Sequence, residues 1–253
     1  VTNSSEIHIV GTCRALDLVE GRIFTSKIWG KYNSSQDLTY EWHVKTNNGY
    51  KKIAYAILKA TWVRVIGHGV VEIAAMPPYL NDIMGINSKM APKYASNDLL
   101  SNTHNQLPVL EFSDNIIKSK NTPIQAVIFT ENFYTTQEDA NLVGNVYFAN
   151  YYIWQRRVWD SFLFSKIKSY FTKNYVNSYE FFCKHTQVDH LREAMPFDEI
   201  IVTLSIEAVF ANGLSVYYEY FKKTANGKEK LAVGRQELIW LSKEQKITNM
   251  PEE

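Results

Sequence analysis

The chain has 253 residues, of which 45% are hydrophobic and 21% are charged, and its formal net charge is +1. This composition predicts an ordinary globular protein with one large or two modest hydrophobic cores, and the scattered Lys and Arg residues form no basic stripe for nucleic acid. No apolar stretch reaches the ~18 residues of a membrane span, and the first residues lack signal-peptide character, so we expect a cytoplasmic protein that binds no membrane.

Alternating apolar residues predict four strands in the first part of the chain, with an Asn-Gly turn between the third and the fourth. These strands lie near Glu6–Arg14, Gly21–Trp29, Leu38–Lys45 and Ile53–Val65. Residues 67–122 follow, rich in Pro, Ser and Asn and with little periodicity. This composition predicts a long linker after a first domain at 1–66.

The second part of the chain predicts a complete α+β domain at 123–244, followed by a polar tail at 245–253. A strand near Gln125–Tyr134 precedes an apolar helix near Asn145–Tyr170. A helix that is apolar nearly all round is expected to be enclosed by a sheet. Four further strands are expected near Tyr179–His190, Glu199–Phe210, Leu214–Lys223 and Lys230–Leu241.

An internal repeat relates the two parts. An offset of 178 residues superposes Leu38–Val65 on Val216–Lys243 without a gap and gives nine identities, among them Tyr40 with Tyr218, Glu41 with Glu219 and Lys52 with Lys230. The same offset places Ile23 on Ile201, Thr25 on Thr203, Ile28 on Ile206 and Arg14 on Arg192. The first copy shows only the last four strands, so we expect an N-terminally truncated copy that lacks roughly 60 to 70 residues.

The cysteines and histidines show no metal-binding pattern. Cys13 and Cys183 are too few for a disulfide framework or a thiolate zinc site, and the six histidines have no paired-ligand spacing. His185 and His190 lie five residues apart in a predicted strand, so they should point to opposite faces. The sequence predicts no metal site and no resident cofactor.

The run from Asp139 to Tyr151 carries the strongest functional signal: Asp-Ala-Asn-Leu-Val-Gly-Asn-Val-Tyr-Phe-Ala-Asn-Tyr. Asp139 and Asn141 stand between a predicted strand and a predicted helix, where either can cap free backbone amides. Exposed amides at a helix N-terminus also stabilise the oxyanion formed when a thioester carbonyl is attacked. One segment could therefore supply a carboxylate and an oxyanion hole, or it could supply helix caps alone.

This segment, followed by Trp154-Gln155, resembles the active-site segment of hot-dog-fold acyl thioesterases, the hydroxybenzoyl-CoA thioesterase-like family, and most closely those of polyketide and enediyne biosynthesis. The resemblance implies a double hot-dog: two tandem copies of a curved antiparallel sheet around a long helix, the first copy truncated. It also implies an active site where the two copies meet.

The resemblance implies roles for individual residues. Asp139 would be the base or nucleophile, and Asn141 and Tyr151 would complete the catalytic set. Gly144, Asn145, Tyr147 and Arg156 would bind the oxyanion or the substrate. The sequence departs from the family at the helix arginine, where Trp159 stands; Arg156 either replaces it or pairs with Asp160 at i, i+4.

The resemblance implies hydrolysis of acyl thioesters carried on the phosphopantetheine of an acyl carrier protein or on coenzyme A, in polyketide biosynthesis. Three alternatives stay open: a double hot-dog acyltransferase/decarboxylase, a dehydratase, and a non-catalytic module that binds an acyl carrier protein. Association with synthase domains or as a homodimer is equally open. The sequence does not specify the acyl chain or the choice of carrier.

Overall fold

The computed structural model describes residues 2–11, 13, 16–30, 34–67, 70–80, 82, 126–166, 180–242, 244 and 246–250. The chain divides into two compact units, residues 1–109 and 110–253. No helix in the described ranges is both long and apolar enough to cross a membrane.

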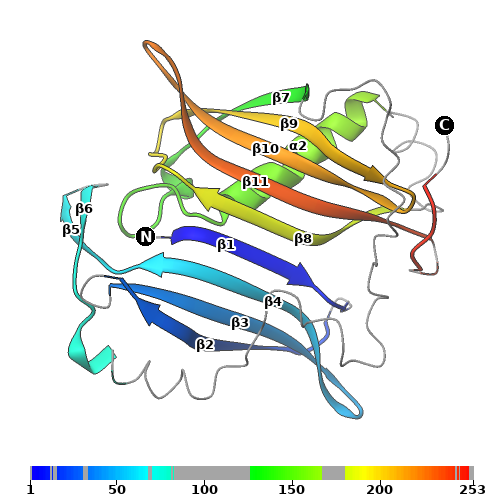
Figure 1. The fold of residues 1–253 in the computed structure, drawn as a ribbon, viewed down its shortest axis with the longest axis horizontal. Coiled ribbons are helices and arrows are strands. Elements are labelled where there is room, and N and C mark those ends of the chain that lie inside the picture. Colours follow the sequence, from blue (N-terminus) through cyan, green and yellow to red (C-terminus); the bar gives the residue numbers. More distant parts are fainter. Residues whose placement is uncertain are drawn as a thin grey trace. The chain divides into compact units, whose positions relative to one another are not determined.

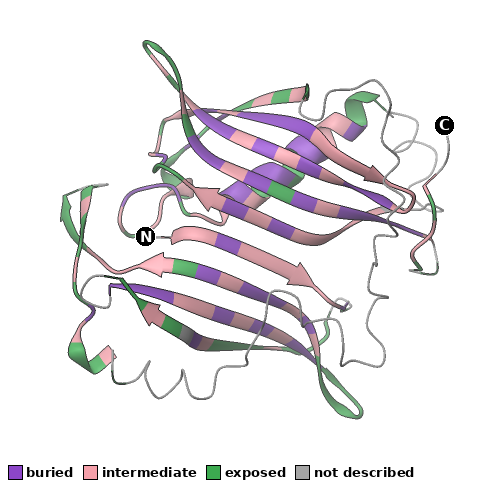
Figure 2. Ribbon diagram, viewed as in Figure 1, coloured by how far each residue is buried: buried purple, intermediate pink, exposed green. Residues whose placement is uncertain are grey.

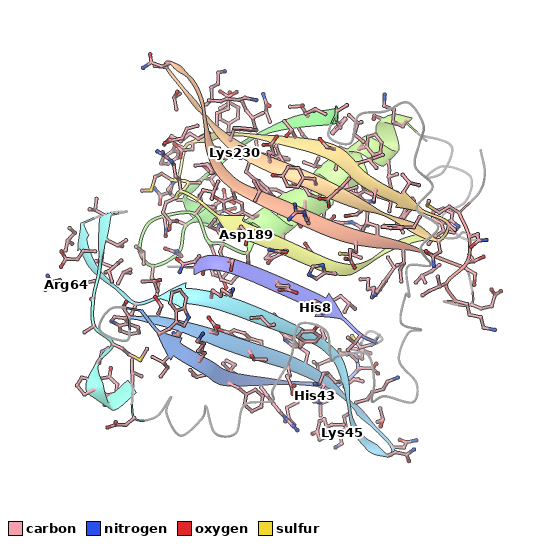
Figure 3. The ribbon with its side chains drawn as sticks, in the orientation of Figure 1. His8, His43, Lys45, Arg64, Asp189 and Lys230 are labelled. Carbon is pink, nitrogen blue, oxygen red and sulfur yellow. The ribbon has the colours of Figure 1, made fainter. Side chains whose placement is uncertain are left out.

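The first unit contains an antiparallel sheet in the strand order β2-β3-β4-β1 (Figure 1). Its strands are β1 (Thr2–Ile9), β2 (Val19–Trp29), β3 (Ser35–Thr46) and β4 (Gly49–Thr61). A separate hairpin joins β5 (Val63–Gly67) to β6 (Val70–Ile73), and Arg64, labelled in Figure 3, pairs there with Glu72. This hairpin extends beyond residue 66, where the sequence predicted the start of the linker.

The second unit has the arrangement that the sequence predicted, a helix on an antiparallel sheet of order β8-β11-β10-β9-β7 (Figure 1). The strand β7 (Val127–Tyr134) leads through the short 3₁₀ helix η2 (Gln137–Asp139) to α2 (Asn150–Lys166). The remaining strands are β8 (Glu180–His190), β9 (Glu199–Phe210), β10 (Gly213–Thr224) and β11 (Gly227–Leu241).

The core of the second unit lies between α2 and the sheet. Figure 2 shows buried positions recurring along β9, β10 and β11, as expected where alternate side chains face a helix. From α2 the core takes Val158, which is fully buried, and from β10 it takes Tyr218 and Tyr220. Gln155 is also fully buried; its side chain accepts from Thr186 Oγ1 at 2.6 Å and donates to a β8 backbone carbonyl at 3.3 Å.

The predicted start of the helix was wrong. The helix α2 begins at Asn150 rather than near Asn145. Gly144 has φ of +97°, and Ala140 and Val146 form an antiparallel bridge, so the intervening residues make a turn that cannot be helical. Residues 167–179, which include the predicted helix end, lie outside the described residues.

The repeat is visible in the strands themselves. The strands β3 and β10 begin and end at residues 178 apart, β4 and β11 begin at residues 178 apart, and both ladders are irregular at the same place, after Trp42 and after Tyr220. Glu41 pairs with Lys52 in the first hairpin, as Glu219 pairs with Lys230 in the second (Lys230 is labelled in Figure 3). Irregularities of this kind are features of a fold, so their coincidence supports two copies of one structural unit.

The 178-residue offset fails before the hairpin, which corrects a sequence prediction. Thr25 faces Leu38 across the sheet, whereas the partner of the matching Val216 is Ile206. Thr25 therefore corresponds to Ile206, not to Thr203, and Ile23 does not correspond to Ile201. The β2–β3 connection, 30–34, is longer than the β9–β10 connection, 211–212, and an ungapped offset cannot include such an insertion. Arg14 lies outside the described residues.

Candidate active site

The turn between η2 and α2 is shaped by Asn141. Its Oδ1 accepts from the backbone amides of Val143 at 2.8 Å and Gly144 at 3.2 Å, and its backbone N–H donates to the Asn145 carbonyl at 2.8 Å. An Asn side chain that bonds the backbone two residues ahead is typical of a tight turn. The Gly144 amide, expected from the sequence to hold an oxyanion, is therefore already donated to Asn141.

Asp139 caps the turn that precedes it, not the long helix. Its Oδ2 accepts from the backbone amide of Thr136 at 2.7 Å and from Thr136 Oγ1 at 3.2 Å, which completes a capping box on η2. Within the described residues, its Oδ1 has no hydrogen-bond partner. Asp139 is half-buried, so one carboxylate oxygen is held and the other is left for a water or a substrate.

The backbone of Asp139 is tied to the start of α2. Its carbonyl accepts from the Tyr147 amide at 2.7 Å and from Asn150 Nδ2 at 3.0 Å. The following amides, those of Phe148 and Ala149, have no acceptor among the residues that the structure describes. The first amides of a helix carry partial positive charge and attract anions. This places a carboxylate-bearing residue beside a start of helix that can bind an oxyanion.

Tyr151 is part of the core. It is 2% exposed, and its ring packs edge-on against His190 at 4.6 Å and Tyr220 at 5.0 Å between ring centroids. Burial, with the negative charges of Glu193 and Asp198, raises the pKa of the Tyr151 hydroxyl. The phenol therefore stays protonated at neutral pH and can donate a hydrogen bond, but it is no nucleophile.

Asn145 is 5% exposed and donates from Nδ2 to the Glu193 carboxylate. Its Oδ1 is buried without a partner among the described residues. The next residue, Val146, donates its amide to the Ala194 carbonyl at 2.8 Å. The turn is thus fixed against the connection between β8 and β9.

His190, at the end of β8, is a neutral neighbour of this turn. It lies on the side of the strand that carries Thr186 and Val188 and faces α2, and its Nε2 is buried without a partner in the described structure. Burial lowers the pKa of His190 to about 4. On the opposite side of the strand, His185 approaches Glu237 of β11 at 4.0 Å.

The remaining predicted substrate-binding residues point elsewhere or lie at the edge of the turn. Arg156 forms an exposed ion pair with Asp160 at 2.7 Å, which is the second of the two alternatives left open by the sequence. Trp159, at the family's arginine position, is 3% exposed in the core. Tyr147 is half-exposed and packs edge-on against Phe148.

Sequence reasoning missed Glu193 and Thr136. Glu193 reaches the turn only because the β8–β9 connection folds back over a separation of 48 residues, and no local pattern encodes that contact. Thr136 could have been found: Thr-x-x-Asp is the spacing of a capping box, here from Thr136 to Asp139.

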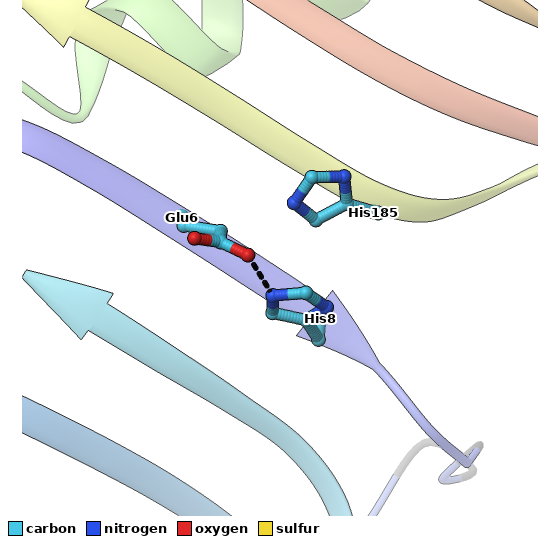
Figure 4. Close-up of side chains that lie close together, drawn as sticks. All are labelled: Glu6, His8 and His185. Carbon is cyan, nitrogen blue, oxygen red and sulfur yellow. Dashed lines mark hydrogen bonds and ion pairs between the residues drawn. The ribbon is translucent and has the colours of Figure 1, made fainter. Parts of the chain in front are cut away.

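The first unit holds a polar pair of its own. His8 bonds to Glu6 two residues earlier on β1 (Figure 4) and stacks on Tyr55 with ring centroids 4.4 Å apart. In β3, Glu41 accepts from His43 Nε2 at 2.8 Å and from Lys52 at 2.7 Å. Each of these acids is therefore satisfied by a base in the same sheet.

The segment that carries this site matches a known protein family. Residues 135–253 match the model of the Thioesterase-like superfamily. No curated protein matches the chain. Among solved structures, a 12:0-ACP thioesterase from Umbellularia californica matches with a TM-score of 0.57 and 11% identity, over 95% of this chain and 72% of that chain.

Two further matches each cover about half of the chain. The dynemicin thioesterase matches with 23% identity and a TM-score of 0.46, over 49% of this chain and 90% of that chain. A 1,4-dihydroxy-2-naphthoyl-CoA thioesterase from Synechocystis matches with 20% identity and a TM-score of 0.41, over 49% and 90%. At these identities, likeness concerns the fold alone. The segment that the family model matches begins at Thr135 and includes the whole turn and α2. This part of the chain therefore belongs to the thioesterase-like superfamily of hot-dog folds.

Proposed function

We propose that this protein hydrolyses acyl thioesters. The observation that carries the proposal is the link between Asp139 and the start of α2, where the Asp139 carbonyl accepts from the Tyr147 amide and the Asn150 side chain. The match of residues 135–253 to a thioesterase-like family supports it. A thioester needs a base for water and donors for the carbonyl oxygen, and in this proposal Asp139 supplies the first and the backbone amides of Phe148 and Ala149 supply the second.

In this mechanism Asp139 acts as the general base. A water molecule bound at Oδ1 attacks the thioester carbonyl carbon while its proton passes to the carboxylate. The developing oxyanion lies at the backbone N–H groups of Phe148 and Ala149. The backbone N–H of Asn145 belongs to the same turn. Asn141 Nδ2 and the protonated Tyr151 hydroxyl orient the substrate. Removing one such oxyanion donor typically costs about 100-fold or more in turnover.

The acyl group would arrive on coenzyme A or on the phosphopantetheine of an acyl carrier protein. Solved neighbours include an acyl-carrier-protein thioesterase and a CoA thioesterase, which makes both carriers worth testing. We further infer that the two units are tandem hot-dog copies acting in a polyketide pathway, on the resemblance of the Asp139–Tyr151 segment to such enzymes.

The test is mass spectrometry of acyl carrier protein and coenzyme A loaded with a panel of acyl groups. The wild-type protein should release free acid, and Asp139→Asn should slow that release by about 100-fold or more. Asp189→Asn, on the side of β8 opposite His190 (Asp189 is labelled in Figure 3), is the matched control and should behave as wild type. Binding of the acyl thioester without turnover would instead indicate a binding module. Loss of carbon dioxide or of water from the acyl group would indicate a decarboxylase or a dehydratase.

A further inference from the structure

Glu193 brings a second carboxylate to the same turn. It lies in the β8–β9 connection, where its Oε2 accepts from Asn145 Nδ2 and the next residue, Ala194, accepts from the Val146 amide at 2.8 Å. Val146 in turn bridges Ala140, the neighbour of Asp139. Three short segments therefore lie side by side, with Asp139 on one outer segment and Glu193 on the other.

The two carboxylates have different surroundings. Asp139 accepts two hydrogen bonds from Thr136, both through its Oδ2. Glu193 is open to solvent, but the protein around it desolvates it enough to raise its pKa, against the opposing hydrogen bond from Asn145. A carboxyl group with a raised pKa can serve as an acid beside another carboxylate that serves as a base.

The other charged groups of the second unit near Glu193 are already engaged. Arg192, its chain neighbour, pairs with Glu229, and Asp198 pairs with Lys222 at 2.9 Å. His190 is neutral at pH 7 because burial lowers its pKa to about 4. Burial raises the pKa of the Tyr151 hydroxyl, and the nearby charge of Glu193 raises it further. Among the described residues of the second unit, Glu193 forms no ion pair, and its Oε2 is held at the turn by Asn145.

We propose that Glu193, held by Asn145, is the general acid that protonates the departing thiol in the hydrolysis proposed above. Water forms a C–O bond to the carbonyl carbon and gives a proton to Asp139. The tetrahedral intermediate collapses, the C–S bond breaks, and the sulfur takes the electron pair of that bond and the proton of Glu193. Transfer of the Asp139 proton through solvent to Glu193 restores both carboxyls.

The role depends on the thiol. An alkyl thiol has a pKa near ~8.5, so its thiolate gains from protonation as it leaves, whereas an electron-poor aromatic thiol leaves readily as the anion. General acid catalysis contributes about 100-fold or more where it is needed. If Glu193 is the general acid, its loss slows hydrolysis of alkyl thioesters and hardly affects aryl thioesters. Loss of a residue with a structural role alone would slow both.

The experiment compares the same acyl group on N-acetylcysteamine and on a nitro-substituted thiophenol. Glu193→Gln retains an oxygen that can accept from Asn145 Nδ2 but has no proton to transfer at neutral pH. We expect its turnover to fall by about 100-fold with the alkyl thioester and by less than about threefold with the aryl thioester. Glu207→Gln, a matched change in the outer pair with Arg235, is the control. Asp139→Asn should slow both thioesters alike.

The outcomes separate the two proposals. An equal loss with both thioesters in Glu193→Gln, with an unchanged melting temperature, would overturn the general-acid role and leave the hydrolase intact. Wild-type protein inactive on both thioesters would overturn the proposed function itself, and the role of Glu193 with it. The pH profile gives a second reading: wild-type turnover of the alkyl thioester should decline as pH rises through the pKa of Glu193, and this decline should vanish with the aryl thioester.

Discussion

The hairpins β3–β4 and β10–β11 share their pairing register and the place of their irregularity, yet their side chains are buried differently. Tyr218 and Tyr220 are fully buried beneath α2, and Tyr218 donates to Gln236 at 2.8 Å. The matching Tyr40 and Trp42 are only half-buried and stack on each other at 6.2 Å between centroids. The described part of the first unit includes no counterpart of α2. The sheet geometry is thus retained in both copies, while burial follows the helix.

Glycine marks the same difference. A Cβ on Gly234 of β11 would come within 2.3 Å of Gln155 Nε2 on α2. The residue at the corresponding position of β4 is Ala56, which is buried but meets no helix of this kind. The side chain of Gln155 on α2 can take this position only because residue 234 has no Cβ. The candidate site is built on α2 and therefore belongs to the second unit.

Removal of a large side chain should show the largest contrast. Tyr220→Ala should lower the free energy of unfolding by about 3 to 5 kcal/mol, because a fully buried ring and its bond to the Tyr151 carbonyl are lost. Trp42→Ala should cost less than about 2 kcal/mol because its side chain is only partly buried. Urea denaturation of both variants measures the difference, and equal losses would contradict a helix-dependent core.

His190 should make the stability of the second unit depend on pH. Its folded pKa of about 4 lies below the unfolded value of 6.5. As pH falls from 6.5 towards 4, His190 is protonated in the unfolded chain but stays neutral in the folded protein. The free energy of unfolding therefore falls, by at most about 3 kcal/mol. Above pH 6.5 that contribution is fully present.

The measurement is the melting temperature of wild type and His190→Phe between pH 7.5 and pH 4.5. The phenylalanine keeps a ring against Tyr151 and removes the titrating group, so its curve should fall less steeply than that of the wild type. Parallel curves for the two proteins would show that His190 does not titrate in this way.

The glycine difference predicts an intermediate effect. Gly234→Ala should cost about 2 kcal/mol, because Gln155 must move and its bonds to β8 weaken. The reciprocal change, Ala56→Gly, should cost only about 1 kcal/mol through backbone entropy and lost burial. If Gly234→Ala left the unfolding free energy unchanged in the same denaturation assay, the close approach of α2 would be in doubt.

The smallest effect is expected at Arg156. Its pair with Asp160 is exposed on both sides, so Arg156→Ala should change the free energy of unfolding by about 0.5 kcal/mol or less. A loss above about 2 kcal/mol in urea denaturation would mean that Arg156 has buried contacts beyond this pair.

Local sequence patterns predicted most of the strands and turns of the second unit. Alternation placed β9 at Glu199–Phe210 with the observed bounds, and the Asn-Gly turns marked both hairpins, where Gly49 and Gly227 have positive φ. The helix start was misplaced because the Asn141 turn and the Val146 bond to Ala194 outweigh the helical tendency of the apolar run. Glu193 could not be predicted, since its contact with Asn145 depends on how the β8–β9 connection folds back.

The proposed site depends most on the carboxylate of Asp139, so the most direct measurement is single-turnover release of thiol from an acyl-CoA by wild type and Asp139→Asn. Hydrolysis by the wild type, slowed about 100-fold or more in Asp139→Asn at an unchanged melting temperature, is the predicted result. Equal rates in the two proteins would remove Asp139 from the chemistry and contradict the proposed site.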